Sequence, residues 1–220
     1  MTVIPWRVKN FLSERFPLLY HLAANFGAKG NSMEHWDARL AKTWDDTSRF
    51  WPAKNQLIAS LTDPSDAVLD IGCGNGSILR ELRLRGYRNL HGLEISEYAI
   101  RRLQDEGIKM HFGVLPAIPL EDAQFDVVIA SQVLEHVIRR KRLLREMRRV
   151  LKPRGQAFIF VPDNCLGPIS EREHVIKFNA YTLRKELERF FAICTIQSIK
   201  DPDHAAPILF AHVRNAAAPH

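Results

Sequence analysis

The chain has little cysteine, with three residues in 220, and one of them, Cys73, lies inside a glycine-rich turn. This excludes the disulfide framework of small secreted domains, so we expect a reducing compartment, the cytoplasm. No apolar run reaches the roughly 18 residues that a membrane span needs. The first residues also lack the basic-then-apolar pattern of a signal peptide. Internal repeats and low-complexity tracts are absent as well. At this length the chain can bury one full core but hardly two.

The most informative segment that is present runs from Val68 to Ser77 and reads VLDIGCGNGS. Its first four residues suit a strand that is covered on both faces, and Asp70 falls near that strand's carboxyl end, where open α/β sheets bind their ligands. Gly72, Gly74 and Gly76 can adopt positive φ and leave no Cβ between the backbone and a ligand. We expect Ser77 to cap the helix that follows. A glycine turn of this kind is weak evidence on its own.

A second acidic residue strengthens the interpretation. Residues 90–95 (LHGLEI) predict another strand, and Glu94 stands at its end, 24 positions after Asp70. In a strand-helix-strand unit, a carboxylate at this separation can accept hydrogen bonds from both hydroxyls of a ribose. The spacing of the glycines differs from the G-x-G-x-x-G pattern of pyrophosphate sites. The pattern therefore favours a nucleoside over a dinucleotide.

Three later segments complete a family pattern: FDVVIAS at 125–131, LEHV at 134–137 and LKPRG at 151–155. Together with the glycine turn they resemble the class I S-adenosylmethionine-dependent methyltransferases, in particular the small-molecule and ubiquinone-pathway group. The resemblance covers roughly residues 66–214 and keeps the family's motif order. It implies a methyltransferase that binds S-adenosylmethionine and releases S-adenosylhomocysteine.

The sequence predicts an α/β fold, because strands alternate with helices from residue 66 onward. We expect strands near 67–72, 90–95, 109–113, 125–131, 156–161, 191–199 and 208–214, and helices near 77–86, 97–106, 137–151 and 182–190. The resemblance implies a Rossmann-like, seven-stranded, mainly parallel sheet with an antiparallel last strand and helices on both faces. We divide the chain into an N-terminal helical extension or lid (1–62), the cofactor-binding methyltransferase domain (63–214) and a tail (215–220).

The resemblance assigns the cofactor residues one by one. The backbone from Gly72 through Cys73 and Gly74 to Gly76 should approach the methionine part, with Asp70 organising its amino group. Glu94 should take the ribose, and Ile95 should lie against the adenine. The family often has Gly-Asp-Ala where this chain has Gly113, Val114 and Leu115. Adenine recognition would then rest on packing and on backbone groups near Leu115. Ser131, at the end of the fourth strand, completes the predicted cofactor set.

The predicted catalytic segment is SQVLEH, residues 131–136. Methyl transfer to an activated carbon needs mainly proximity and alignment, and a base only to remove the acceptor's proton. His136 is our candidate base, because imidazole titrates near neutral pH. A cap or a core hydrogen bond is the plain alternative for this histidine.

His174 follows the fifth strand after a loop and is a second catalytic candidate. Glu135, His136 and His174 could converge on a divalent cation, as in small-RNA 2′-O-methyltransferases and ubiquinone-pathway enzymes, which this segment resembles. Gln132 stands where those families have a first glutamate and is a poorer ligand for a hard cation. We therefore do not favour a metal. The alternative is that Glu135 and His174 only brace the loop.

The basic excess lies in one segment. Residues 139–154 hold nine Lys or Arg against Glu146, a net charge of +8, while the whole chain carries +6. The apolar positions recur at helical spacing and should pack on the sheet, which leaves the arginines outside. A solvated face is the ordinary interpretation. An RNA, an anionic membrane surface or a phosphorylated substrate are alternative partners, although no RNA-binding motif or aromatic platform accompanies the run.

The first 62 residues are rich in aromatic side chains. Trp36, Arg49 and Trp51, with Gln132 from the catalytic segment, are our candidates for binding the acceptor and excluding water. Core packing explains the aromatics equally well. We expect O-methylation of a small molecule, a sugar or a glycan. The alternatives are a metal-assisted RNA ribose 2′-O-methyltransferase and a catalytically silent cofactor-binding scaffold or sensor. Acceptor, O- versus N-methylation and oligomeric state stay open.

Overall fold

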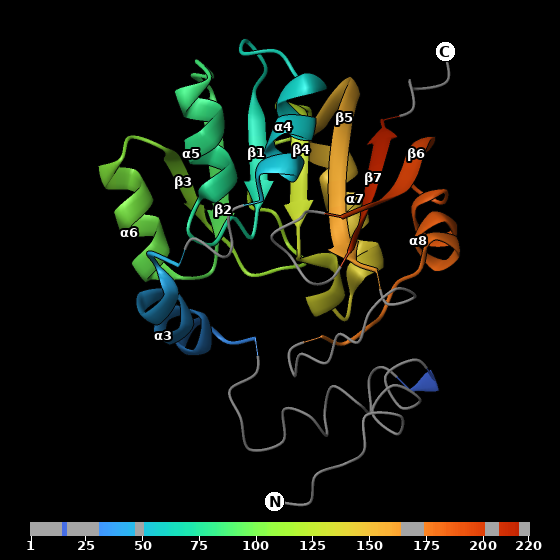
Figure 1. Cartoon of the computed structure of the whole chain (residues 1–220), viewed down its shortest axis with the longest axis horizontal. Coiled ribbons are helices and arrows are strands. Elements are labelled where there is room, and N and C mark those ends of the chain that lie inside the picture. Colours follow the sequence, from blue (N-terminus) through green and yellow to red (C-terminus); the bar gives the residue numbers. More distant parts are fainter. Residues whose placement is uncertain (1–14, 17–30, 47–50, 164–173, 201–206, 216–220) are drawn as a thin grey trace, which may run out of the picture.

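The computed structural model describes residues 15–16, 31–46, 51–163, 174–200 and 207–215. At its centre lies a seven-stranded sheet with the order β3-β2-β1-β4-β5-β7-β6 (Figure 1). Only β7 runs antiparallel to its neighbours, β5 and β6. The strands are β1 (Val68–Ile71), β2 (Leu90–Glu94), β3 (Lys109–Phe112), β4 (Phe125–Ser131), β5 (Leu151–Pro162), β6 (Ala192–Ile199) and β7 (Ile208–Arg214). The predicted fold class and strand count are confirmed.

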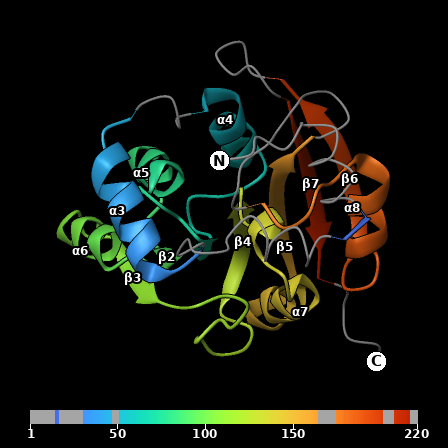
Figure 2. The same ribbon diagram turned by 90° about the horizontal axis from the view of Figure 1, so that it is seen from below.

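Helices cover both faces of the sheet (Figure 2). The helices are α3 (Met33–Thr43), α4 (Pro52–Ser60), α5 (Ser77–Leu84), α6 (Glu97–Asp105), α7 (Arg140–Val150) and α8 (Ala180–Leu187), with a 3-10 turn, η2 (Leu134–His136). Buried side chains of α3 to α6 form one apolar cluster with the sheet, and those of α7 and α8 form another on the opposite face. Each cluster removes a continuous apolar surface from water.

Several predicted boundaries are wrong by a few residues. The helix expected from 137 begins only at Arg140, because residues 134–136 form a separate 3-10 turn and Val137 is extended. The fifth strand begins at Leu151 instead of 156, directly where α7 ends. The last helix begins at Ala180, two residues before its predicted start, and ends at Leu187, three residues before its predicted end. There the Asn179 side chain accepts a hydrogen bond from the Thr182 N–H, and the Thr182 hydroxyl oxygen accepts one from the Asn179 N–H. This reciprocal cap fixes the start of the helix.

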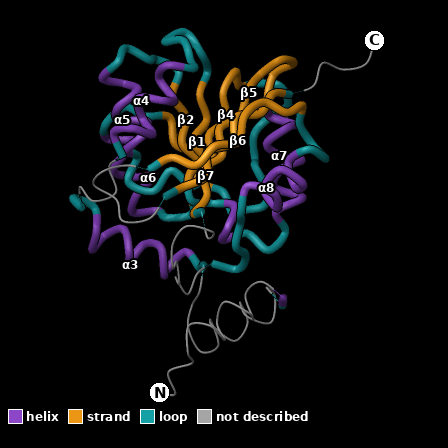
Figure 3. The backbone as a smooth tube through the Cα atoms, turned by 45° about the vertical axis from the view of Figure 1, so that its right-hand side comes forward, coloured by secondary structure: helices purple, strands orange, loops and turns teal. Residues whose placement is uncertain are grey.

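The parallel strands bring their carboxyl ends to one edge of the sheet. Asp70 on β1 lies level with Gly92 on β2 and Ile129 on β4. Polar residues at the ends of these three strands therefore meet at a single place. Helix α3 lies at this edge, beside α6 (Figures 1 and 3).

Helix α3 is tied to α5 and α6 by Asp37, in its middle, and by Trp44, at its C-terminal end. Asp37 accepts hydrogen bonds from the Ser96 hydroxyl (2.5 Å) and the Tyr98 N–H (3.1 Å), at the start of α6. Trp44 is buried, and the guanidinium carbons of Arg80, on α5, and Arg102, on α6, each lie 5.0 Å from its ring centre. A carboxylate near a helix N-terminus and cations on an aromatic ring are both stabilising.

None of the helices that the structure describes has the length and the apolar run required to span a bilayer.

Candidate cofactor and acceptor site

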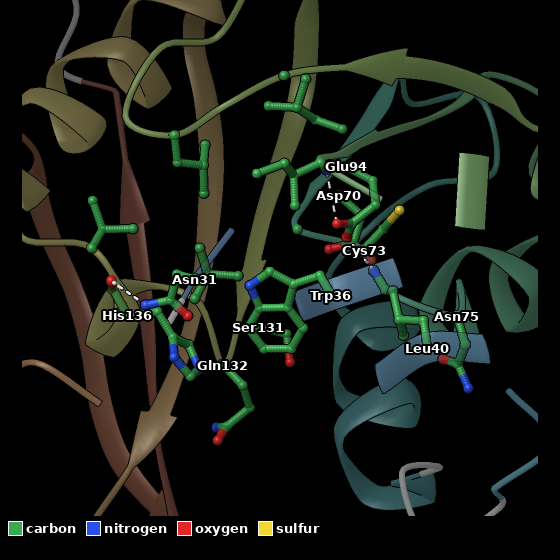
Figure 4. Close-up of a pocket in the computed structure, with 18 of the residues that line it drawn as sticks. Asn31, Trp36, Leu40, Asp70, Cys73, Asn75, Glu94, Ser131, Gln132 and His136 are labelled. Carbon is green, nitrogen blue, oxygen red and sulfur yellow. Dashed lines mark hydrogen bonds between the residues drawn. The ribbon is translucent and has the colours of Figure 1, made fainter. Parts of the chain in front are cut away.

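A cavity of about 920 Å³ opens at the carboxyl ends of β1, β2 and β4, with α3 and α4 contributing to its walls (Figure 4). Pockets for single drug-sized ligands occupy roughly 300–1,000 Å³. The cavity is therefore large enough for a nucleoside and a second small molecule. In Figure 4 the Trp36 indole lies between two groups of labelled side chains: Asp70, Cys73 and Glu94 on one side, and Asn31, Gln132 and His136 on the other.

The glycine turn between β1 and α5 adopts the conformation expected from the sequence. Gly72, Gly74 and Gly76 have φ of 63°, 56° and 73°, in the left-handed region that favours glycine. A Cβ at Gly76 would lie 2.5 Å from a Leu103 side-chain carbon, whereas one at Gly74 would meet only ordinary contact, 3.8 Å from Leu40. Close packing against Leu103 therefore requires a glycine at position 76. Of the three glycines, only Gly74 has space where a Cβ would lie.

The predicted role of Ser77 as a helix cap is wrong. Gly76 is the N-cap of α5 and makes no side-chain hydrogen bond, and Ser77 is already the first helical residue. The Asn75 side chain accepts a hydrogen bond from the Ser77 N–H at 3.3 Å instead. The start of α5 therefore presents backbone groups to the cavity, as a binding site for a polar ligand requires.

Glu94 joins the glycine turn to the end of β2. Its Oε2 accepts a hydrogen bond from the Gly74 N–H (2.9 Å), and its Oε1 accepts from the Ile95 (2.8 Å) and Ser96 (3.1 Å) N–H groups. Burial raises the pKa of this carboxyl, and the three N–H donors oppose the shift. Each carboxylate oxygen has two lone pairs, so Oε2 keeps one for a further donor. The carboxylate faces the cavity, as a ribose ligand requires, and its ribose role stays a prediction.

Asp70 and Lys54 form a buried acid-base pair at the floor of the cavity. Asp70 is 2% exposed, and its Oδ1 has no hydrogen-bond partner in the part of the chain that the structure describes. The Lys54 ammonium, on α4, donates to the Ser131 hydroxyl at 3.0 Å. Burial raises the pKa of Asp70 to about 7, against the pull of Lys54, and lowers the pKa of Lys54 to about 8, against the pull of Asp70.

Sequence reasoning missed Lys54, although the chain carried a signal. Lys54 stands three positions after Trp51 and four before Ile58, which is fully buried, so it lies on the core-facing side of α4. A lysine in such a position is rarely buried without a partner. The helical spacing could therefore have marked it as a site residue.

The predicted adenine-side residues all line the cavity. Ile95 and Leu115 are half-buried, and Val114 is 54% exposed at the rim. Cys73 also contributes to the wall, but its sulfur is directed toward β2, where a Cβ at Gly92 would lie 2.8 Å from it. Burial raises the pKa of the Cys73 thiol further above its ordinary value. Cys73 therefore acts through its backbone and its packing, and its thiol stays protonated at neutral pH.

The predicted acceptor side of the cavity begins directly after β4. Gln132 is not glycine and yet has φ of 57°, and its side-chain Nε2 is buried without a hydrogen-bond partner among the described residues. Strained backbone of this kind is often found at functional sites. The buried amide is therefore available as a donor to a ligand.

The structure brings His136 and His174 together, as the sequence predicted. The two rings pack edge to face with their centres 4.8 Å apart, and His136 makes a similar contact with Trp36 at 5.6 Å. The backbone carbonyl of Glu135 accepts hydrogen bonds from the Val175 N–H (2.8 Å) and the Ile176 N–H (3.4 Å). These bonds hold the segment after residue 173 against the 3-10 turn. Ligand atoms of Glu135, His136 and His174 all lie within 4.8 Å of one another.

The predicted acceptor-binding residues are only partly placed. Trp36 and Trp51 line the cavity together with Gln132. Arg49 lies outside the described residues. Arg39 and Arg139, which were not among the predicted site residues, also line the cavity.

The sequence of the chain is similar to those of known proteins. The sequence profile of the family described as "Methyltransferase domain" matches residues 69–159. A ubiquinone biosynthesis O-methyltransferase of Pseudomonas putida is 31% identical over 160 residues, which cover 64% of this chain and 68% of that protein. The chain belongs to the S-adenosylmethionine-dependent class I methyltransferases.

A further sequence relative and two solved structures are also similar to this chain. The 27-O-demethylrifamycin SV methyltransferase of Amycolatopsis mediterranei is 30% identical over 148 residues, and the match spans 60% of this chain and about half, 53%, of that relative. A solved S-adenosylmethionine-dependent methyltransferase from Aquifex aeolicus superposes with a TM-score of 0.63 at 16% identity, over 82% of this chain and 98% of that one. Another from Mesorhizobium loti superposes with a TM-score of 0.62 at 19% identity, over 78% of this chain and 99% of that one.

The residues of this methyltransferase fit S-adenosylmethionine. The unpartnered Asp70 oxygen and the neighbouring Lys54 ammonium offer one negative and one positive group to a zwitterionic amino acid. Glu94 supplies a second carboxylate in the wall of the same cavity. The backbone of Gly74 also lines the cavity and has no side chain to cover it. The site thus provides complementary groups for both ends of the cofactor.

Proposed function

We propose that the protein transfers a methyl group from S-adenosylmethionine to an oxygen of a small molecule, a sugar or a glycan in the cytoplasm. The observation that carries this proposal is the position of His136. Its ring lies in the same cavity as the glycine turn, held between Trp36 and His174, directly after the strand that ends at Ser131. When bound, S-adenosylmethionine supplies an activated methyl group on its sulfonium sulfur.

The side chains divide the work between binding and proton transfer. Asp70 and Lys54 would bind the cofactor's amino and carboxylate groups, and Glu94 would bind its ribose. The Gln132 amide would donate a hydrogen bond to the acceptor, and Trp36 would exclude water. A ring nitrogen of His136 would take the acceptor's hydroxyl proton as the carbon-oxygen bond forms and the carbon-sulfur bond breaks. The products are a methyl ether, S-adenosylhomocysteine and a protonated imidazole.

The test uses S-adenosylmethionine with an isotope-labelled methyl group, incubated with the protein and a fractionated small-molecule extract. Mass spectrometry finds the labelled product, and its methyl chemical shift distinguishes an ether from an amine. With the acceptor in hand, His136→Gln should lower kcat by a factor on the order of 10²–10⁴, because the base is lost. It should leave the affinity for S-adenosylhomocysteine unchanged. Unchanged kcat, or a labelled N-methyl product, would contradict the proposal.

A second function has one specific observation in its favour, the convergence of Glu135, His136 and His174. A carboxylate and two imidazoles are suitable ligands for a divalent cation. A bound cation would supply Lewis acidity to the acceptor hydroxyl, including a ribose 2′-hydroxyl of RNA. Under this alternative, excess chelator abolishes turnover and Glu135→Gln has the same effect. Full activity in excess chelator excludes it, and cofactor binding without turnover on any acceptor would favour the scaffold alternative.

A further inference from the structure

The outward face of α7 carries a row of unbalanced positive charges. Its apolar side chains, Leu143, Leu144, Met147 and Val150, are fully buried against the sheet. Five basic residues lie on the exposed side or at its N-terminal end, and we call them the α7 basic face: Arg139, Lys141, Arg142, Arg145 and Arg148. No carboxylate lies within 4.0 Å of their charged atoms in the part of the chain that the structure describes.

Three other basic residues between positions 139 and 154 make contacts within the fold. Arg140 pairs with Glu186 of α8 at 3.1 Å, and Lys152 pairs with Asp126 at 2.7 Å. Arg149 donates to the carbonyl oxygens of Ile118 (2.8 Å) and Leu120 (2.7 Å), and so holds the connection between β3 and β4 against α7. These three are therefore accounted for, whereas no side chain of the α7 basic face makes an ion pair or hydrogen bond with the described residues.

The opposite side of the sheet is arranged differently. On α5 and α6, Arg85 pairs with Glu81 and Arg101 lies 4.0 Å from Glu97, and Arg80 pairs with Glu106. Most arginines of these two helices therefore have a nearby carboxylate, whereas the exposed Arg83 and Arg88 have none within 4.0 Å among the described residues. Within the part of the chain that the structure describes, unpaired cations are thus more concentrated on α7 than on α5 and α6.

The α7 basic face is continuous with the mouth of the cavity. Arg139 lines the cavity, and so does its neighbour Ile138, which is 44% exposed. Val114, on the rim, is 54% exposed and apolar. The mouth therefore presents apolar side chains directly beside arginines, a combination that suits the boundary between lipid headgroups and acyl chains.

We propose that the α7 basic face docks the protein on an anionic membrane surface, with the mouth of the cavity beside the bilayer. A row of cations on a convex helix complements a plane of mobile anionic headgroups, and each basic residue near such a surface strengthens binding roughly fivefold. An RNA is the less suitable partner, because no aromatic side chain for stacking on bases lies on α7 in the described structure. Docking would expose the cavity to acceptors that carry an apolar tail.

The test is flotation of the full chain with phosphatidylcholine vesicles, with and without phosphatidylglycerol. The wild type should bind only the anionic vesicles, and less at higher salt. The triple variant Lys141→Gln, Arg145→Gln, Arg148→Gln should bind about 100-fold more weakly. It omits Arg139, which lines the cavity, so its affinity for S-adenosylhomocysteine should equal that of the wild type.

The matched control removes three exposed arginines from the other side of the sheet: Arg83→Gln, Arg88→Gln and Arg101→Gln. It has the same net charge as the α7 variant and should keep wild-type vesicle binding. Equal losses in both variants would refute the proposal, because net charge alone would then explain them. So would an α7 variant that still binds anionic vesicles, or a wild type that binds single-stranded RNA but no vesicle.

Discussion

Replacing Lys54 by methionine tests the proposed recognition of the cofactor's amino-acid end. Lys54 is 7% exposed, and its ammonium lies next to the Ser131 hydroxyl in the floor of the cavity. Methionine keeps the length and the apolar stem of the side chain and removes the charge. A hydrogen bond to a charged group contributes about 1.5–3 kcal/mol. Lys54→Met should therefore weaken the binding of S-adenosylhomocysteine by roughly ten- to a hundredfold.

The same substitution also acts through Asp70. The pKa of this carboxyl is raised to about 7 by burial, and the nearby Lys54 ammonium holds it down. Without the ammonium the pKa of Asp70 should rise further, so that the carboxyl is neutral at pH 7 and attracts the cofactor's amino group less. The loss of affinity in Lys54→Met should consequently shrink as the pH rises and Asp70 ionises.

The assay is titration calorimetry with two ligands. S-adenosylhomocysteine carries the amino-acid group, and methylthioadenosine has the same nucleoside without it. Lys54→Met should lose affinity for the first and keep wild-type affinity for the second, while Lys54→Arg should retain part of the affinity for the first. Equal losses for both ligands would mean that Lys54 only supports the shape of the cavity. Unchanged affinity for S-adenosylhomocysteine would refute the assignment outright.

Two further predictions concern stability. Gly76→Ala should lower the free energy of unfolding by about 2–4 kcal/mol, because it adds strain at φ of 73° and a clash with Leu103. The control is Gly107→Ala, which has a similar φ of 78° but only ordinary contacts, and it should lower the free energy of unfolding by about 1 kcal/mol. Urea titrations that give equal losses for the two variants would refute the clash with Leu103. Burial raises the pKa of Asp70 to about 7, so the folded protein holds a proton that the unfolded chain releases near pH 4. As the pH rises from about 4 to 7, the free energy of unfolding of the wild type should thus fall by up to about 1.4 kcal/mol per pH unit relative to that of Asp70→Asn. Parallel stability profiles of the two proteins would contradict this.

Much of the fold could be predicted from local pattern. The bounds of β4 and β7 agree with the sequence to the residue, because short apolar runs between turn residues mark buried strands clearly. The start of α7 could not be predicted, since no Ser, Thr, Asp or Asn immediately precedes Arg140 to signal a cap. The cap of α5 was misassigned for the opposite reason. Ser77 is a good capping residue, but the left-handed Gly76 already ends the turn.

The candidate site was predictable where its residues belong to one continuous motif. Asp70, the glycines and Glu94 stand at fixed distances along a strand-helix-strand unit, so their meeting followed from topology. Lys54 reaches the site from a helix outside that unit, and its approach to Ser131 depends on how α4 packs. The helical spacing signals that Lys54 is buried but not which residue it meets, and the positive φ of Gln132 has no sequence signal at all. Long-range packing decides such features.

The packing of α3 and α4 bears on how this protein can be divided. Leu40 and Ile58 are buried in the same cluster as α5 and α6, and Lys54 reaches the floor of the cavity from α4. A fragment that starts at residue 63 would keep every family motif and lose one wall of the cofactor cavity. Chimeras that exchange acceptor recognition between relatives therefore need their crossover before Met33. A junction at the first strand would separate Asp70 from its cation.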